Sequence, residues 1–188
     1  LDRRETPCLF VDMGTNGEIA LGSARDGFVT CATAAGPAFE GAEIACGMAG
    51  APGAIDRVTL DGGEIVTHVI GGGSAAGICG SGLIDAVAVM LDLGIISESG
   101  RLEVPDGDGR FFRADGQAAF RLTDRVYITQ QDVRKLQLAK SAIRAGIETL
   151  SRSRRFDEMI IAGGFGSFVN IENAVRIGLL PDVSGITV

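Results

Sequence analysis

Residues 9–21 constrain the fold of this chain more than any other stretch. Leu9, Phe10 and Val11 form a short apolar run, which is typical of a strand buried on both faces. Asp12 follows, and the next turn, at 14–17, contains Asn-Gly, the strongest short signal for a β-hairpin. An apolar segment then leads the chain back out. The stretch therefore predicts a hairpin with one carboxylate at the end of its first strand.

The same turn carries groups that can bind a phosphate and its magnesium ion. The backbone amides of Gly14, Thr15, Asn16 and Gly17 and the Thr15 hydroxyl can donate hydrogen bonds to phosphate oxygens. Asp12 can hold the metal through its water shell, and it is the candidate catalytic and metal-binding residue. Asn-Gly hairpins are common, however, and an acid near a turn is often only solvated. On this stretch alone, the phosphate site and the plain turn are equal alternatives.

The composition argues against several classes of protein. With 188 residues and 46% hydrophobic content, the chain can form one domain or two small lobes around a real core. Its net charge of −7 argues against nucleic acid or an anionic membrane as the main partner. It has neither a membrane-length apolar run nor a signal-peptide pattern, which predicts a cytoplasmic protein. The four cysteines are scattered, so we expect no zinc or iron–sulfur site within these residues. Leu1 is not a natural start, so we expect a piece of a longer chain.

After the hairpin, the sequence predicts another strand and a short helix. Residues 27–33 suit a pleated sheet and complete a three-strand meander, which we expect to be antiparallel. A Gly-Pro break at 36–37 predicts a short helix that reaches Met48. Glu40 lies near the positive end of that helix, where an acid is stabilising, and a catalytic role for it is the less favoured alternative.

The next segments predict a second hairpin and a buried helix. Residues 58–60 and 64–70 alternate around a Gly-rich turn, as paired strands do. His68, the only histidine, lies in this hairpin with no acid beside it, and we interpret it as a packed or surface residue. The glycines at 77–82 precede a helix at 83–91, where they either allow close packing, which we favour, or expose amides to an anion.

The second half of the chain contains its strongest helix signal. Residues 97–124 change in composition and predict a flap or hairpin excursion. Thr129 and Asp132 then predict a variant capping box at the start of a long helix with one buried stripe. Three polar or charged residues lie off that stripe: Gln137, Lys140 and Arg144.

A second glycine signal follows this helix. Residues 159–162 predict a buried strand, and Gly163, Gly164, Phe165 and Gly166 come directly after it. A glycine pair at a strand end lets a flat ring lie on the backbone, because no Cβ intervenes. The alternative is an ordinary tight turn into the last helix.

The two glycine signals together resemble motifs of the actin, sugar-kinase and Hsp70 ATPase superfamily. Asp-Met-Gly-Thr-Asn-Gly-Glu at 12–18 resembles its phosphate motif, and Ala-Gly-Gly-Phe-Gly-Ser at 162–167 resembles its adenosine motif. Further segments resemble the C-terminal ATPase domain of the reductive activators of corrinoid proteins, at 35–41, 77–85 and 138–146. This narrower resemblance spans nearly the whole chain and thins only in the predicted excursion.

The resemblance implies an α/β fold of the ribonuclease H-like, actin-like ATPase type, with a mixed sheet, the antiparallel three-strand meander and flanking helices. In that family, ATP use is coupled to the return of a cobalt(II) corrinoid protein to cobalt(I). The electrons pass through a [2Fe-2S] cluster in an N-terminal domain, which we expect only in a part absent from this sequence. The resemblance thus implies ATP and Mg²⁺ as cofactors. It assigns Asp12 and residues 14–17 to the phosphates and metal, residues 163–166 to adenosine, and Gln137, Lys140 and Arg144 to the helix that flanks adenosine.

The chain departs from this family in its extent. No second Asp-x-Gly-Thr motif precedes residue 12, so the first phosphate motif and its lobe are missing. We therefore expect residues 1–188 to form a single lobe, the second lobe of an ATPase domain, which binds nucleotide weakly and hydrolyses it poorly by itself. The nucleotide hypothesis requires the turns at Gly14 and Gly163 to face one cleft.

The expected partner is a corrinoid protein or a corrinoid-dependent methyltransferase, and a homodimer is an open alternative. Two other functions are compatible with the sequence. One is a small-molecule kinase of the same superfamily. The other is a non-catalytic docking module for a corrinoid protein, in which nucleotide binding is vestigial.

Overall fold

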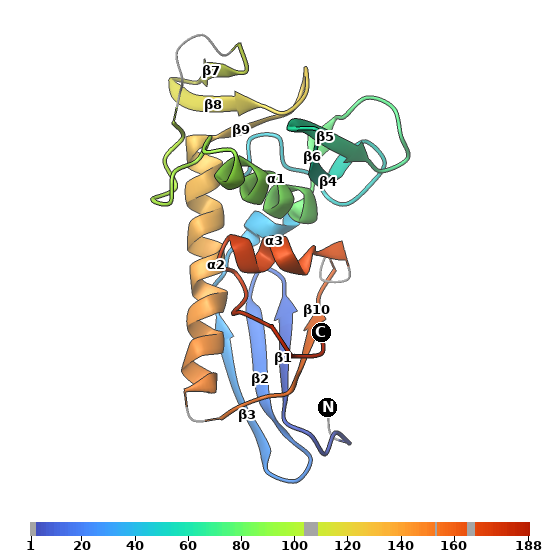
Figure 1. Cartoon of the computed structure of the whole chain (residues 1–188), viewed down its shortest axis with the longest axis vertical. Coiled ribbons are helices and arrows are strands. Elements are labelled where there is room, and N and C mark those ends of the chain that lie inside the picture. Colours follow the sequence, from blue (N-terminus) through green and yellow to red (C-terminus); the bar gives the residue numbers. More distant parts are fainter. Residues whose placement is uncertain (1–2, 104–108, 153, 165–167) are drawn as a thin grey trace.

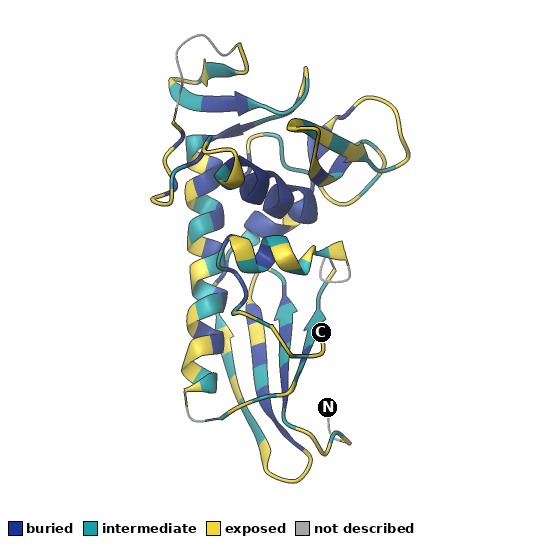
Figure 2. Cartoon of the chain, viewed as in Figure 1, coloured by how far each residue is buried: buried dark blue, intermediate teal, exposed yellow. Residues whose placement is uncertain are grey.

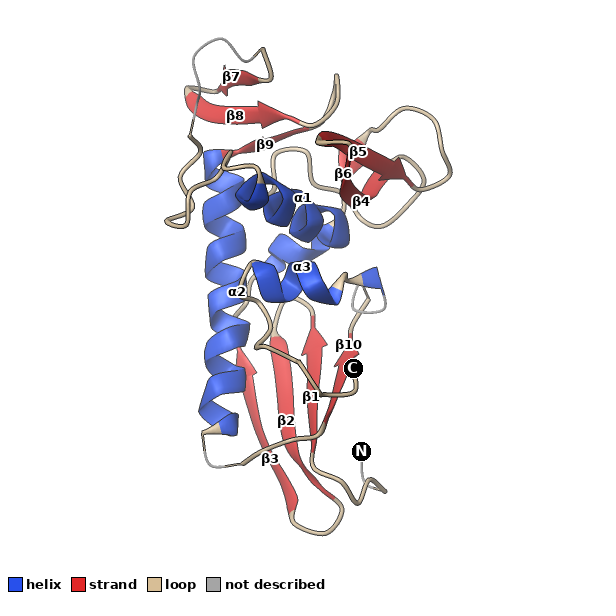
Figure 3. Cartoon of the chain, viewed as in Figure 1, coloured by secondary structure: helices blue, strands red, loops and turns tan. Residues whose placement is uncertain are grey.

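The computed structural model describes residues 3–103, 109–152, 154–164 and 168–188. A four-stranded sheet lies at one end of the molecule and two three-stranded sheets lie at the other, with α1 and α3 between them and α2 alongside (Figure 1). Figure 3 shows α1 and α3 in blue between the two sets of strands in red, with α2 beside them. Within the described part of the chain, no helix is both long enough and apolar enough to cross a membrane.

The four-stranded sheet positions both glycine turns. β1 (Cys8–Met13), β2 (Gly17–Ser23) and β3 (Gly27–Thr33) form the antiparallel meander that the sequence predicts. β10 (Glu158–Ala162) pairs in parallel with β1, which gives the strand order β10-β1-β2-β3. Because parallel strands end at the same edge of a sheet, the turn after β1 lies beside the turn after β10.

The long helix α2 (Gln130–Ser151) packs against β2 and β3. It begins with a complete capping box, in which the Thr129 hydroxyl accepts from the Asp132 N–H at 3.1 Å and the Asp132 carboxylate accepts from the Thr129 N–H at 2.9 Å. Gly146 allows the close approach, because a Cβ there would lie 2.6 Å from Ile19 and 2.7 Å from Thr33. The predicted stripe is buried at Val133, Leu136, Ala139, Ile143 and Ile147.

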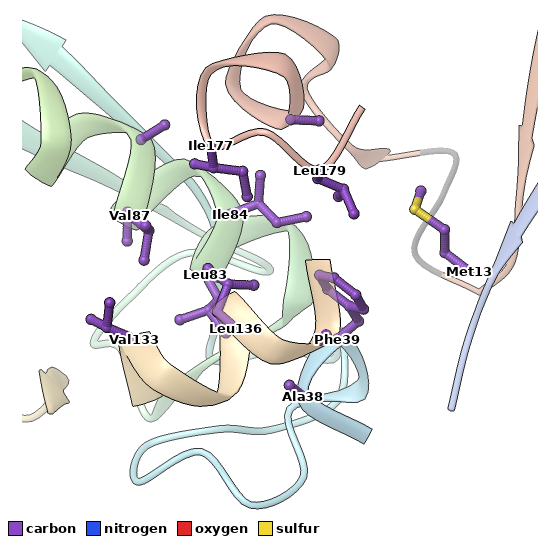
Figure 4. Close-up of a cluster of buried hydrophobic side chains, with 14 of the residues drawn as sticks. Met13, Ala38, Phe39, Leu83, Ile84, Val87, Val133, Leu136, Ile177 and Leu179 are labelled. Carbon is purple, nitrogen blue, oxygen red and sulfur yellow. The ribbon is translucent and has the colours of Figure 1, made fainter. Parts of the chain in front are cut away.

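Helix α1 (Gly80–Asp92) forms the centre of the core and is buried from Gly80 to Met90, as its dark blue colour in Figure 2 shows. α3 (Ile171–Arg176) packs against it. Figure 4 shows side chains from four segments of the chain meeting here: Leu83, Ile84 and Val87 of α1, Val133 and Leu136 of α2, Ala38 and Phe39, and Ile177 and Leu179 after α3.

One buried carboxylate connects these elements. Asp85 is 3% exposed; its carboxylate accepts from Asn173 Nδ2 at 2.7 Å and from the Val58 N–H at 3.2 Å. Burial raises the pKa of Asp85, and these two hydrogen bonds act in the opposite direction. The side chain therefore joins α1 to α3 and to the neighbouring sheet at a cost in desolvation.

Two smaller sheets complete the structure. β5 (Glu64–Val69), β4 (Ala54–Asp61) and β6 (Gly77–Ile78) form the first, and β4 and β5 are the predicted second hairpin. The second sheet comprises β7 (Phe111–Ala114), β8 (Gln117–Arg121) and β9 (Tyr127–Thr129), with antiparallel pairing throughout. Its first two strands form a hairpin within the segment predicted as a flap or hairpin excursion.

The short helix predicted to extend to Met48 is wrong in its length. Between residues 37 and 48 the structure has a 3₁₀ helix alone, η1 (Pro37–Glu40), which ends at Gly41 in a left-handed conformation with φ of 78°. A Cβ at Gly41 would lie within 3 Å of the backbone of Met48, so the chain folds back tightly on itself here. The turn that brings these two backbones together prevents the helix from continuing.

Candidate functional site

The two glycine turns line one cavity of about 610 Å³. Gly14 and Gly164 both contribute to its wall, together with Phe39, Glu40 and the first turn of α1. Gly163 has a φ of 105°, and a Cβ there would overlap the Met13 carbonyl and lie 3.0 Å from Asp12 Oδ1. The turn after β10 thus packs directly on the end of β1, which is the arrangement that the nucleotide hypothesis requires.

Asp12 is half-buried at the end of β1, in register with Glu18 on β2 and Ala162 on β10. Its carboxylate lies next to Gly163, the first residue of the second turn. Among the described residues, no three or more histidine, cysteine, aspartate or glutamate side chains form a group that could enclose a metal ion. A single carboxylate such as Asp12 is compatible with magnesium, because this ion keeps most of its water and is commonly held by one or two carboxylates together with phosphates.

The turn between β1 and β2 presents Thr15 and Asn16 to solvent, and the two Thr15 donors already have a partner. The Thr15 N–H and the Thr15 hydroxyl both donate to Glu40 Oε1, at 2.9 and 2.8 Å. The Thr15 carbonyl in turn accepts from the Gly36 N–H at 2.9 Å, which fixes the turn to the segment before η1. Glu40 therefore contacts the predicted phosphate turn, a role that its position near a helix end did not indicate.

A second pair of polar side chains lines the cavity from β4 and β5. His68 Nδ1 lies 2.6 Å from Asp56 Oδ1, and both residues belong to the cavity wall. Ser81 of α1 donates to the Asp56 carbonyl at 2.9 Å. His68 is an exposed residue of β5, as predicted, but the expectation that no acid lies beside it is wrong. A histidine with one ring nitrogen on a carboxylate can use the other to accept or donate a proton.

A β-bulge explains why the sequence did not reveal this pair. The hairpin register aligns Arg57 with His68 and then shifts, so that Ile55 aligns with Val69 and Asp56 is the extra residue. Without the bulge, Asp56 would pair with Val69 and would point to the opposite face from His68. The bulge turns the carboxylate toward the imidazole.

The glycines in the first turn of α1 are explained by packing. A Cβ at Gly80 would overlap the Phe39 carbonyl, and one at Gly82 would overlap the Ile55 carbonyl. The first residues of α1 also line the cavity, and the N-cap residue Cys79 makes no side-chain capping hydrogen bond.

The described part of the cavity wall carries acidic side chains and no lysine or arginine. Its acids are Glu40 and Asp56, and it also includes the single histidine. Its remaining described members are apolar or small, and Phe39, Met48, Ile70 and Phe168 form the apolar part.

The off-stripe residues of α2 lie elsewhere. Gln137 and Lys140 line a separate pocket of about 60 Å³, and Lys140 Nζ donates to the Ile177 carbonyl. Burial lowers the pKa of Lys140, and nearby Arg144 lowers it further. Arg144 donates to the Leu180 carbonyl at 2.6 Å and pairs with Glu148 at 2.7 Å. None of the three is a described member of the large cavity's wall, so their contact with adenosine stays a prediction. Phe165 and Gly166 lie outside the described residues.

Comparison with known proteins identifies the family. The family model for the C-terminal domain of RACo, the ASKHA domain, matches residues 6–188. The chain belongs to this family. The fold predicted from the motifs, an actin-like ATPase domain of the α/β class, is thereby confirmed.

Several members of this activator family are similar along most of the chain. The corrinoid activation enzyme RamQ of Eubacterium limosum is 38% identical over 208 residues, covering 100% of this chain and 35% of RamQ. The [Co(II) methylated amine-specific corrinoid protein] reductase of Methanosarcina barkeri is 31% identical, covering 93% of this chain and 35% of the reductase. A solved structure of a reductive activator for corrinoid, iron–sulfur protein superposes with a TM-score of 0.88 at 41% identity, covering 95% of this chain and 31% of that one. The chain thus spans about a third of the length of these relatives.

Proposed function

We propose that this chain is the nucleotide-binding lobe of an ATP-dependent activator, which returns a cobalt(II) corrinoid protein to cobalt(I). One observation carries the proposal: in a chain of the ASKHA family, the turns at Gly14 and Gly164 line a single cavity of about 610 Å³. A cavity of that size lies in the range that holds a nucleotide-sized ligand. The relatives that activate or reduce corrinoid proteins support the corrinoid partner.

In this proposal the residues that line the cavity and those beside it have separate tasks, and Asp12 is beside it, at the end of β1. Asp12 would hold magnesium through its water shell, and the turn at 14–17 would receive the phosphates. The metal supplies positive charge that stabilises the phosphate oxygens when ATP is hydrolysed. Gly164 offers backbone without a side chain and with no atom within 4 Å of the place that a Cβ would take, so the adenosine can lie on it, while Gly163 packs the turn on the end of β1. Gln137, Lys140 and Arg144 would flank it only if the nucleotide extends toward the second pocket.

In this proposal the chain supplies only part of the ATPase. We propose that residues 1–188 act as one lobe of a two-lobed ATPase, with the segment at 97–124 as a flap-like excursion. The other half of the phosphate clamp and the [2Fe-2S] cluster would come from other parts of the protein, and the site of action would be the cytoplasm. Because half of the positioning groups are missing, the lobe alone is expected to bind nucleotide weakly and to turn it over poorly.

Calorimetric titration of the full-length protein tests the proposal. Mg–ATP should bind to the wild type, and a corrinoid protein or corrinoid-dependent methyltransferase should bind with an affinity that depends on the nucleotide. Tight partner binding without any effect of nucleotide would instead favour a docking module. That alternative has one structural observation in its favour, because the Thr15 donors are already occupied by Glu40. Transfer of phosphate to a small molecule would favour a kinase.

A further inference from the structure

Glu40 occupies two of the donors that the phosphate turn would offer to a nucleotide. The Thr15 N–H and hydroxyl converge on one carboxylate oxygen, Glu40 Oε1, at 2.9 and 2.8 Å. Two donors on one anionic oxygen is also how such a turn binds a phosphate oxygen. The carboxylate therefore satisfies the turn as a phosphate oxygen would.

The backbone that carries Glu40 is fixed, whereas its side chain is exposed and is held by the two hydrogen bonds from Thr15. Phe39 is buried in the core beside it, and Gly41 closes η1 with its N–H on the Ala38 carbonyl at 3.1 Å. Glu40 itself is exposed. A rotation of its side chain into solvent can release Thr15 without movement of η1 or the turn.

The described side chains around this contact carry negative charge and no positive charge. Glu40 and Asp56 line the cavity, Asp12 lies at the end of β1 next to Gly163, and no lysine or arginine is among the described lining residues. A metal-free phosphate that approaches Thr15 meets a carboxylate already hydrogen-bonded there, and no cationic side chain among the described wall residues offsets the repulsion. A divalent metal on the phosphates neutralises much of that charge.

We propose that Glu40 makes the phosphate turn selective for metal-bound nucleotide: its carboxylate holds the turn when the site is empty and repels phosphates that arrive without a metal. This inference rests on the proposed function, because it concerns the same turn and the same ligand. It gives Glu40 a role in ligand selection that is separate from the metal-holding role of Asp12.

The test compares Glu40→Gln with Glu43→Gln in the full-length protein. Gln at 40 keeps an oxygen for Thr15 and removes the charge. Glu43→Gln removes the same charge three residues away, at an exposed side chain that pairs with Lys135 at 4.0 Å and is no described part of the cavity wall. The dissociation constant of ADP is measured by calorimetry at low salt, once with EDTA and once with Mg²⁺.

The ratio of the metal-free to the Mg²⁺ dissociation constant is the readout. It should fall by at least about tenfold in Glu40→Gln, through tighter binding of metal-free ADP, because one close like charge is removed. It should not change in Glu43→Gln. A ratio in Glu40→Gln equal to that of the wild type would overturn the inference. If Glu40→Gln loses its thermal transition, Glu40→Ala is the second variant, with the same expected direction.

Inorganic pyrophosphate separates this inference from the proposed function. If the wild type binds ADP under neither condition, the nucleotide proposal fails. Pyrophosphate in EDTA then still decides the role of Glu40, because it needs only the turn. Tighter pyrophosphate binding to Glu40→Gln than to Glu43→Gln supports the inference, and equal binding contradicts it.

Discussion

Gly163→Ala probes the contact that joins the two turns of the site. Gly163 has a φ of 105°, a conformation that a residue with a Cβ rarely adopts. The new methyl group would also overlap the Met13 carbonyl and lie 3.0 Å from Asp12 Oδ1. The substitution therefore adds both backbone strain and a steric clash, and it displaces the proposed metal-holding carboxylate.

The two costs can be separated with matched glycines. The unfavourable φ costs about 1–2 kcal/mol, and overpacking costs about 1–3 kcal/mol more, so Gly163→Ala should destabilise the fold by about 2–5 kcal/mol. Gly27 has a φ of 71° and no neighbouring atom within 4 Å of the place that a Cβ would take, so Gly27→Ala should carry only the first cost. Gly164→Ala has neither and should change stability by less than about 0.5 kcal/mol.

Urea unfolding of the three variants measures these differences. Midpoints should shift in the order Gly163→Ala, Gly27→Ala, Gly164→Ala, with slopes unchanged. Mg–nucleotide affinity should fall in Gly163→Ala and not in Gly27→Ala, which lies at the far turn of the meander between β2 and β3. Equal stability of Gly163→Ala and Gly27→Ala would refute the close packing of the second turn on β1.

Three further predictions follow from individual side chains. Asp12→Asn should weaken Mg²⁺-dependent nucleotide binding roughly 10–100-fold in calorimetry, the usual cost of an outer-sphere partner, and an unchanged affinity would remove Asp12 from the metal site. Because burial raises the folded-state pKa of Asp85, the folded protein binds this proton more tightly than the unfolded chain. The wild type should therefore lose stability relative to Asp85→Asn as the pH rises from the ordinary Asp pKa of 3.8 through the raised value, and denaturation curves with a constant difference across that window would contradict this. His68→Gln breaks a pair whose histidine side chain is 60% exposed, so the thermal midpoint should reflect a loss below about 1 kcal/mol, and a loss well above that would show that the pair supports the fold.

The elements that the sequence predicted well are those set by local signals. The meander from β1 to β3 follows from a short apolar run, an Asn-Gly turn and a segment that suits a pleated sheet, and α2 follows from its capping box and one apolar stripe. Both signals act within a few residues, so no tertiary information is needed to find them. The sequence also predicts that a strand precedes each glycine turn. If these two strands are parallel neighbours, as β1 and β10 are, the two turns must lie side by side.

The errors come from contacts that reach beyond a single helical turn. The helix expected up to Met48 ends at Gly41 because the backbones of these two residues pack together, which no local propensity encodes. The contact between Thr15 and Glu40 spans 25 residues, and local signals offered only the helix dipole as a reason for the acid. The Asp56–His68 pair depends on a one-residue bulge, and a bulge changes which face a side chain occupies.

Amide chemical shifts on addition of Mg–nucleotide test the central claim most directly, because the claim concerns where the ligand lies. We expect the largest changes to fall on both turns, at Gly14–Gly17 and at Gly163 and Gly164, with smaller ones at His68 across the cavity. Changes confined to the pocket of Gln137 and Lys140 would contradict the claim, and so would the absence of changes at both glycine turns.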